Sequence, residues 1–79
     1  MNVLAILKHF EKQGDVKSAE EFFKILRGVK FVSTENYKAL LRTYVHVDKV
    51  PTRISELMLE DNVSPDEETN NLLKQIVES

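Results

Sequence analysis

The sequence predicts an all-α protein that is a piece of a helical repeat array. Apolar residues recur at steps of three and four between Ser33 and Val47, which is typical of an amphipathic helix. A similar pattern stands 34 residues earlier, and a weaker copy follows at a step of 33. The matching positions are Ala5, Ile6, Leu7 and Phe10 with Ala39, Leu40, Leu41 and Tyr44, and Lys38 and Leu40 with Asn71 and Leu73. This period is about that of known two-helix repeats.

The first repeat should be a hairpin of two helices. The first helix covers residues 2–13 and should end at Gly14, because glycine is the preferred residue after a helix. Asp15 is the expected N-cap of a second helix that stops near Gly28. The short connection makes the two helices antiparallel, with Phe22 and Phe23 at the centre of the hairpin.

Three further helices are expected. Ser33 or Thr34 should cap the third, which places Tyr37, Leu40, Leu41, Tyr44 and Val45 on one apolar stripe. The fourth should run from about Pro51 to Asp61, with Pro51 at its first position.

The fifth helix has its own start signal. Ser64 is the expected N-cap, Pro65 the first helical residue and Glu67 the reciprocal capping side chain. It should end near Val77, and its apolar residues are Leu72, Leu73, Ile76 and Val77. The predicted units are residues 1–32, residues 33–65 as a shortened repeat, and residues 66–79 as a terminal helix of a partial repeat or cap.

Composition and charge narrow the possible functions. Seventy-nine residues make one small domain near the lower size limit for a single apolar core, and the absence of cysteine excludes disulfides and thiolate metal sites. The net charge of −2 argues against strong, indiscriminate nucleic-acid binding. Residues 1–53 hold ten Lys or Arg against six Asp or Glu, whereas residues 54–79 hold one against seven. No apolar run reaches the ~18 residues of a membrane span, and the start has no targeting character.

No residue pattern indicates catalysis, a metal or a cofactor. His9 and His46 have no partner at ligand spacing. The acids near the end lack the spacing of a calcium loop and are better explained as helix caps and solvated charges. Lys8, Lys12, Lys38 and Arg42 fall on first helices, where they could form a phosphate-binding groove or simply a solvated face. We expect no enzyme activity.

Two sequence stretches resemble known repeat families. QGDVKSAEEFF, residues 13–23, is similar to both the tetratricopeptide and the pentatricopeptide repeat. ENYKALLRTYV, residues 35–45, followed after one further helix by NVSPDEET, resembles the pentatricopeptide pattern, and the tetratricopeptide tryptophan is missing. The chain therefore resembles the last repeats of a plant-type, organellar pentatricopeptide repeat protein.

This resemblance implies a right-handed α-solenoid whose first helices line a groove for single-stranded RNA, one base per repeat. The implied base readers are Leu4 and Ser33 in the first unit, Lys38 and Asp66 in the second and Asn71 in the third. Lys12 and His46 stand at the implied phosphate-binding positions. The sequence departs from the pattern because Leu4 cannot donate a hydrogen bond, Lys38 replaces a neutral polar residue, and Glu35 and Glu68 replace apolar ones.

The resemblance also implies organelle RNA processing by the parent protein, in the mitochondrion or alternatively the chloroplast. We expect this chain, as a monomer, to bind single-stranded RNA only weakly, because two or three repeats make few contacts. The alternative is a protein-interaction or solenoid-capping module without RNA contact, which the acidic residues 54–79 favour.

Overall fold

The computed structural model describes residues 2–51 and 53–78, and these residues are all helical apart from their connections. The helices are α1 (Val3–Gln13), α2 (Val16–Gly28), α3 (Thr34–His46), α4 (Ile54–Glu60) and α5 (Glu67–Glu78). The all-α class and the five helices in the described part of the chain are confirmed. The handedness of a longer solenoid and the three unit boundaries stay predictions.

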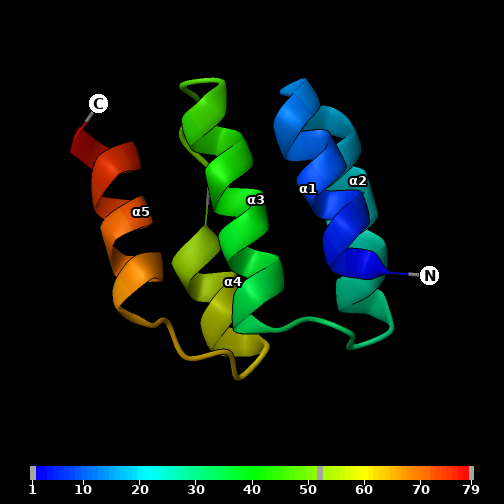
Figure 1. Cartoon of the computed structure of the whole chain (residues 1–79). Coiled ribbons are helices and arrows are strands. Elements are labelled where there is room, and N and C mark those ends of the chain that lie inside the picture. Colours follow the sequence, from blue (N-terminus) through cyan, green and yellow to red (C-terminus); the bar gives the residue numbers. More distant parts are fainter. Residues whose placement is uncertain (1, 52, 79) are drawn as a thin grey trace.

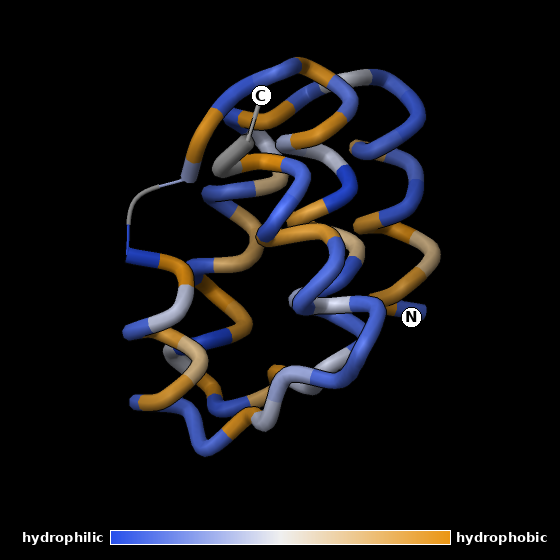
Figure 2. The backbone as a smooth tube through the Cα atoms, turned by 90° about the vertical axis from the view of Figure 1, so that its left-hand side faces the viewer, coloured by the Kyte–Doolittle hydropathy of each residue, from blue (hydrophilic) through white to orange (hydrophobic). Residues whose placement is uncertain are grey.

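Helix α3 lies at the centre of the molecule. It packs between α1 and α5, so that the first helices of successive units stand side by side, and α2 and α4 lie behind them (Figure 1). Hydrophobic and hydrophilic segments alternate along the helices, as expected of amphipathic helices packed in layers (Figure 2). The buried apolar residues of α3 are Tyr37, Ala39, Leu40, Leu41 and Tyr44. Leu7, Phe23 and Ile76 from neighbouring helices pack on this core.

Side-chain caps begin four of the helices. Asn2, Asp15 and Ser33 each accept a hydrogen bond from a backbone N–H three residues later, which confirms Asp15 and Ser33 as N-caps. The start predicted for α5 is wrong. Asp66, and not Ser64, caps this helix, because its carboxylate accepts hydrogen bonds from both the Thr69 N–H (2.9 Å) and the Thr69 hydroxyl (2.8 Å). Pro65 precedes the cap and is not the first helical residue.

Helix α4 is shorter than predicted. It has seven residues and begins at Ile54, so Pro51 is not its first residue. The reason is the backbone of Arg53, whose φ of 59° is left-handed and cannot continue into a preceding helical turn. The second hairpin, which lacks two residues relative to the first, therefore has a truncated second helix.

The helix ends repeat the same backbone geometry. Gly14 (φ 67°) and Asp48 (φ 55°) are both left-handed and stand 34 residues apart, at the ends of α1 and α3. The next N–H after each donates back into the helix, from Asp15 to the Phe10 carbonyl and from Lys49 to the Tyr44 carbonyl, each at 3.0 Å. These are Schellman-type ends, so the repeat in the sequence extends to the backbone.

Two details of the predicted apolar faces differ from the structure. Val45 is 37% exposed and does not belong to the buried stripe of α3, because it is rotated by about 100° around the helix from the buried Tyr44. Phe23 is buried, whereas Phe22 only borders the core and packs edge-on against Phe10. The side chain of Val77 lies outside the described residues. No described helix is both long and apolar enough to cross a membrane.

Candidate nucleic-acid interface

The parallel placement of α1, α3 and α5 brings the implied reader positions to the starts of neighbouring first helices (Figure 1). Leu4 lies in the first turn of α1, Lys38 early in α3 and Asn71 early in α5. Ser33 and Asp66 are the N-cap residues of α3 and α5, next to the helices that carry Lys38 and Asn71. Ser33 therefore lies between α1 and α3, and Asp66 lies between α3 and α5.

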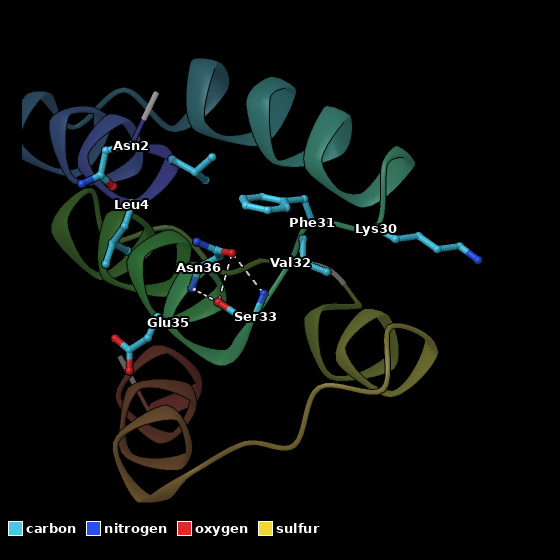
Figure 3. Close-up of a pocket in the computed structure, with 9 residues that line it drawn as sticks. Asn2, Leu4, Lys30, Phe31, Val32, Ser33, Glu35 and Asn36 are labelled. Carbon is cyan, nitrogen blue, oxygen red and sulfur yellow. Dashed lines mark hydrogen bonds between the residues drawn. The ribbon is translucent and has the colours of Figure 1, made fainter.

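An open hollow separates the starts of α1 and α3. It has a volume of about 720 Å³, and its lining includes Leu4, Phe31, Ser33, Glu35 and Asn36. The structure thus brings together the two reader positions of the first unit, Leu4 and Ser33 (Figure 3). Leu4 supplies only apolar surface there, so hydrogen bonding in this hollow falls to other residues.

The corresponding place between α3 and α5 is filled by charges. The Lys38 ammonium lies 2.9 Å from Asp66, 3.0 Å from Glu35 and 3.3 Å from Glu68, and Lys38 is only 6% exposed. These bonds, with that to Asp66 foremost, raise the pKa of Lys38, and the Lys38 ammonium lowers the pKa of Asp66. The two implied readers of the second unit are therefore bonded to each other, and the Lys38 cation is neutralised within the protein.

Arg42, one turn further along α3, is also paired. Its guanidinium donates to Glu68, and this hydrogen bond lowers the pKa of the Glu68 carboxyl. Glu68 therefore holds both Lys38 and Arg42. Neither cation is a free phosphate ligand in this structure, although both side chains lie on first helices as the sequence indicated.

The remaining implied residues stand apart from this cluster. Asn71 is exposed on α5, and Lys12 is exposed near the end of α1. His46 ends α3 with its ring against the turn at Gly14, where a Cβ on Gly14 would lie 3.2 Å from the ring. Lys12 and His46 thus lie at the ends of first helices opposite to the readers, and Lys12 makes no ion pair among the described residues.

Sequence reasoning missed a second set of contacts between the repeats. Arg27 of α2 pairs with Asp61 after α4, with Nε to Oδ2 at 2.7 Å, and the Tyr37 hydroxyl donates to the same carboxylate. Arg27 lowers the pKa of Asp61, while burial and this bond raise the pKa of Tyr37. The Tyr44 hydroxyl donates to Glu20 at 2.6 Å. The 34-residue separation of Arg27 and Asp61 was a signal that could have identified the pair.

These contacts account for the uneven charge along the sequence. Basic residues of the first half bind acidic residues of the second across the repeat boundaries, as in Arg27 with Asp61 and Lys38 with Asp66. Most of the acidic cluster therefore joins adjacent helices and is not only a solvated surface. Among the described residues, no group of three His, Cys, Asp or Glu side chains could hold a metal ion.

Comparison with known proteins decides the family. The chain is 40% identical over 67 residues to the mitochondrial pentatricopeptide repeat-containing protein At4g02820 of Arabidopsis thaliana, a match that covers 85% of this chain and 13% of that protein. It is 35% identical to At1g02370 and 37% identical to At4g01990, each over 68 residues. Both are also mitochondrial pentatricopeptide repeat-containing proteins of Arabidopsis thaliana, and the matches cover 86% of this chain. This chain belongs to the pentatricopeptide repeat family.

The matches also show how much of each relative this chain covers and where the relatives are located. The pentatricopeptide repeat chain spans only 13–14% of the length of these curated relatives. All three relatives are named as mitochondrial, which supports the mitochondrion as its location. No family model matches the chain, and no solved structure matches it.

Proposed function

We propose that this chain is a segment of a larger mitochondrial pentatricopeptide repeat protein that binds single-stranded RNA during RNA processing. The observation that carries the proposal is the alignment of α1, α3 and α5, which puts successive reader positions at adjacent helix starts. A strand of RNA that follows this edge would meet the Leu4 hollow, then the pair of Lys38 and Asp66, then Asn71. Repeats that read one base each require such an arrangement.

Binding by these units alone is weak in this proposal. The Lys38 and Arg42 cations are neutralised by carboxylates, so few positive charges remain on α3 to release counterions from RNA. The exposed Lys12 and His46 are the remaining basic groups at implied phosphate positions. The sequence-independent part of the affinity therefore rests on a small number of contacts.

An amide chemical-shift titration with a mixed pool of short single-stranded RNA at low salt tests this function. We expect shifts at Lys12, Lys38, His46 and Asn71 that disappear when salt is added, because phosphate contacts weaken steeply with salt. Tight, salt-resistant binding would contradict the weak electrostatic mode, and no shifts would contradict RNA contact by this segment.

A protein-docking function is the second candidate, and one observation favours it. Ile25 in α2 and Val29, the C-cap residue of that helix, are 63% and 68% exposed, so two large apolar side chains four residues apart face solvent. Binding through this surface would bury apolar area and would respond little to salt. The salt dependence of the binding affinity, for RNA or for a protein partner, therefore separates the two functions.

A further inference from the structure

The hollow between α1 and α3 contains a polar group without a partner. Asn36 is only 8% exposed, and its side-chain oxygen accepts hydrogen bonds from the Ser33 N–H (3.0 Å) and the Ser33 hydroxyl (3.1 Å). This fixes the orientation of the amide, because only the oxygen can accept from a backbone N–H. The amide nitrogen, Nδ2, must then be at the other end.

Asn36 Nδ2 is directed into the hollow. Nothing in the described residues accepts a hydrogen bond from it, and no described side-chain nitrogen or oxygen is both fully buried and unpaired. The nitrogen therefore reaches open space, and Figure 3 shows it pointing toward the side of α1 that carries Leu4. A buried amide whose NH₂ group presents two unpaired N–H donors to a hollow is a hydrogen-bonding site for a ligand.

An aromatic ring stands in the same hollow. Phe31 is 61% exposed, and its ring points toward Asn36, whereas Lys30 points away (Figure 3). The backbone of Phe31 is fixed, because its N–H donates to the Leu26 carbonyl at 2.8 Å. The Phe31 ring is thus a flat apolar surface at the edge of the hollow, attached to a backbone that the hydrogen bonds at the end of α2 hold in place.

The second repeat shows that packing does not require this ring. Val63 occupies the equivalent place, with its N–H donating to the Met58 carbonyl at 2.9 Å, and it packs on the core as Phe31 does not. Likewise Thr69, the equivalent of Asn36, is buried with its hydroxyl bonded to Asp66 and has no free amide. The exposed ring and the free donor are therefore specific to the first hollow.

We propose that Phe31 and Asn36 form a nucleobase-binding site in this hollow, in which the base stacks on the Phe31 ring and accepts a hydrogen bond from Asn36 Nδ2. Base stacking on aromatic side chains is a general mode of single-strand binding, and every base carries acceptors that an amide donor can reach. The inference rests on the proposed RNA binding but adds residues that the family resemblance does not implicate. The Leu4 side chain supplies the apolar wall opposite the donor.

The charge of the hollow favours a base over a phosphate. Glu35 lines the hollow beside Ser33, and its carboxylate is already paired with Lys38 at 3.0 Å, so it offers no positive charge that would hold an anion. Lys30 also lines the hollow, but its side chain points away from it (Figure 3). The other lining groups are apolar or neutral polar, which suits an uncharged, flat ligand. One amide NH₂ group discriminates little between bases, so this site should show weak sequence preference.

The test is a titration of the whole 79-residue chain, with adenosine and uridine as uncharged probes and with short single-stranded RNA. The Phe31 ring protons and the Asn36 side-chain NH₂ resonances report on the site. We expect both sets to shift with the nucleosides and with RNA. Phe31→Leu should weaken this binding about five- to hundredfold, and Phe31→Tyr should retain it.

Matched variants separate the site from general effects. Val29→Ala removes an equally exposed apolar side chain outside the hollow and should leave binding unchanged. Asn36→Asp keeps the oxygen that Ser33 requires but removes the donor, and it should weaken binding more than Asn70→Asp, which makes the same change of charge on α5.

The outcomes are distinguishable. Nucleoside shifts at Phe31 and Asn36 without any RNA binding would support the base site and contradict the proposed function. RNA shifts at Lys12 and His46 with none at Phe31 would overturn the base site and leave RNA binding standing. No nucleoside or RNA response at Phe31, or equal losses in Phe31→Leu and Val29→Ala, would also overturn it.

Discussion

At the scale of single residues, Glu68 controls how much positive charge the first helices present. It accepts from both Lys38 and Arg42, while Asp66 and Glu35 complete the neutralisation of Lys38. The implied second reading position is therefore a closed ion-pair cluster, in contrast to the open hollow beside Leu4. In the proposed function, a strand of RNA would have to displace carboxylates to reach the Lys38 ammonium.

Replacing Glu68 should strengthen RNA binding. Glu68→Gln removes one carboxylate and frees Arg42, so we expect the affinity for a short single-stranded RNA at low salt to rise about twofold to tenfold. Fluorescence anisotropy measures this change. Glu67→Gln makes the same charge change at an exposed neighbour, and an equal gain in that control would show that only net charge matters.

Asp61 should be important for stability. It accepts from Arg27 and from the Tyr37 hydroxyl, so Asp61→Asn weakens one bond that joins the first two repeats and one bond within the second repeat. We expect the free energy of unfolding to fall by about 1.5–3 kcal/mol, as is typical for hydrogen bonds to charged groups. Urea denaturation followed by circular dichroism measures it.

The control for Asp61 is its neighbour Glu60. Its contact with Arg27 is longer, at 3.5 Å, and its side chain is 57% exposed. Exposed ion pairs contribute little, so Glu60→Gln should change the stability by less than about 0.5 kcal/mol. Equal losses in the two variants would mean that Asp61 has no special role at the repeat boundary.

At the scale of helices, the chain makes its sharp turns with residues that are not the usual choice. Gly14 suits its left-handed backbone, but Lys30, Asp48, Arg53 and Asn62 adopt positive φ angles of 55–59° without being glycine. A left-handed backbone costs a residue with a Cβ about 1–2 kcal/mol, less for Asn or Asp. The helix ends are therefore sites where stability can be gained.

Glycine at these turns should stabilise the protein. We expect Lys30→Gly to raise the free energy of unfolding by about 0.5–1 kcal/mol, because relief of the left-handed strain exceeds the added flexibility of the unfolded chain. Asn62→Gly should gain less, because asparagine tolerates this conformation. Thermal unfolding by calorimetry provides the measurement.

A glycine in the middle of a helix supplies the contrast. Lys24 is exposed in α2, so Lys24→Gly should lose about 1 kcal/mol. If Lys30→Gly destabilised the protein as much as Lys24→Gly does, the left-handed geometry at Lys30 would not be a source of strain.

At the scale of the whole molecule, α3 holds both neighbouring units together. Leu41 is completely buried in this helix, so Leu41→Ala should lower the free energy of unfolding by about 2–5 kcal/mol through lost burial and a cavity. That is a large part of the roughly 4–12 kcal/mol expected for a chain of this size. Amide hydrogen exchange should show loss of protection in α1 and α5 together.

Leu59 is the matched control for this core substitution. It is 80% exposed on α4, so Leu59→Ala removes the same atoms without opening a cavity and should cost less than about 0.5 kcal/mol. Loss of protection confined to α3 in Leu41→Ala would contradict a single cooperative unit.

The ion pairs between units should limit stability to a window of pH. The pKa values of Asp61, Asp66 and Glu68 are lowered in the folded state, so their stabilisation is present above about pH 4 and is lost as the pH falls through the folded values. The pKa values of Tyr37, Tyr44 and Lys38 are raised, so their contribution is lost above about pH 10. The melting temperature measured from pH 2 to 11 checks this. A melting temperature that stays constant below about pH 4 would contradict it.

The sequence alone was sufficient to predict features that depend on neighbouring residues. Helical spacing predicted the amphipathic helix around Tyr37 and Leu41, and the local caps at Asp15 and Ser33 were visible because a cap bonds only three residues away. The period of 34 predicted a two-helix repeat, and the resemblance of ENYKALLRTYV and NVSPDEET to the pentatricopeptide pattern indicated the family, which the relatives confirm. Where several local signals competed, as at Ser64 and Asp66, the sequence did not rank them correctly.

Only the tertiary structure determined which side chains meet across the repeats. Lys38 has an ordinary surface pattern in the sequence, yet the packing of α5 on α3 places carboxylates from 28 and 30 residues away on its ammonium. The free Asn36 donor and the exposed Phe31 ring share a hollow for the same reason, because the packing of α1 on α3 brings the starts of these two helices together. Local sequence sets helices and caps, whereas contacts between distant residues depend on how the buried faces fit together.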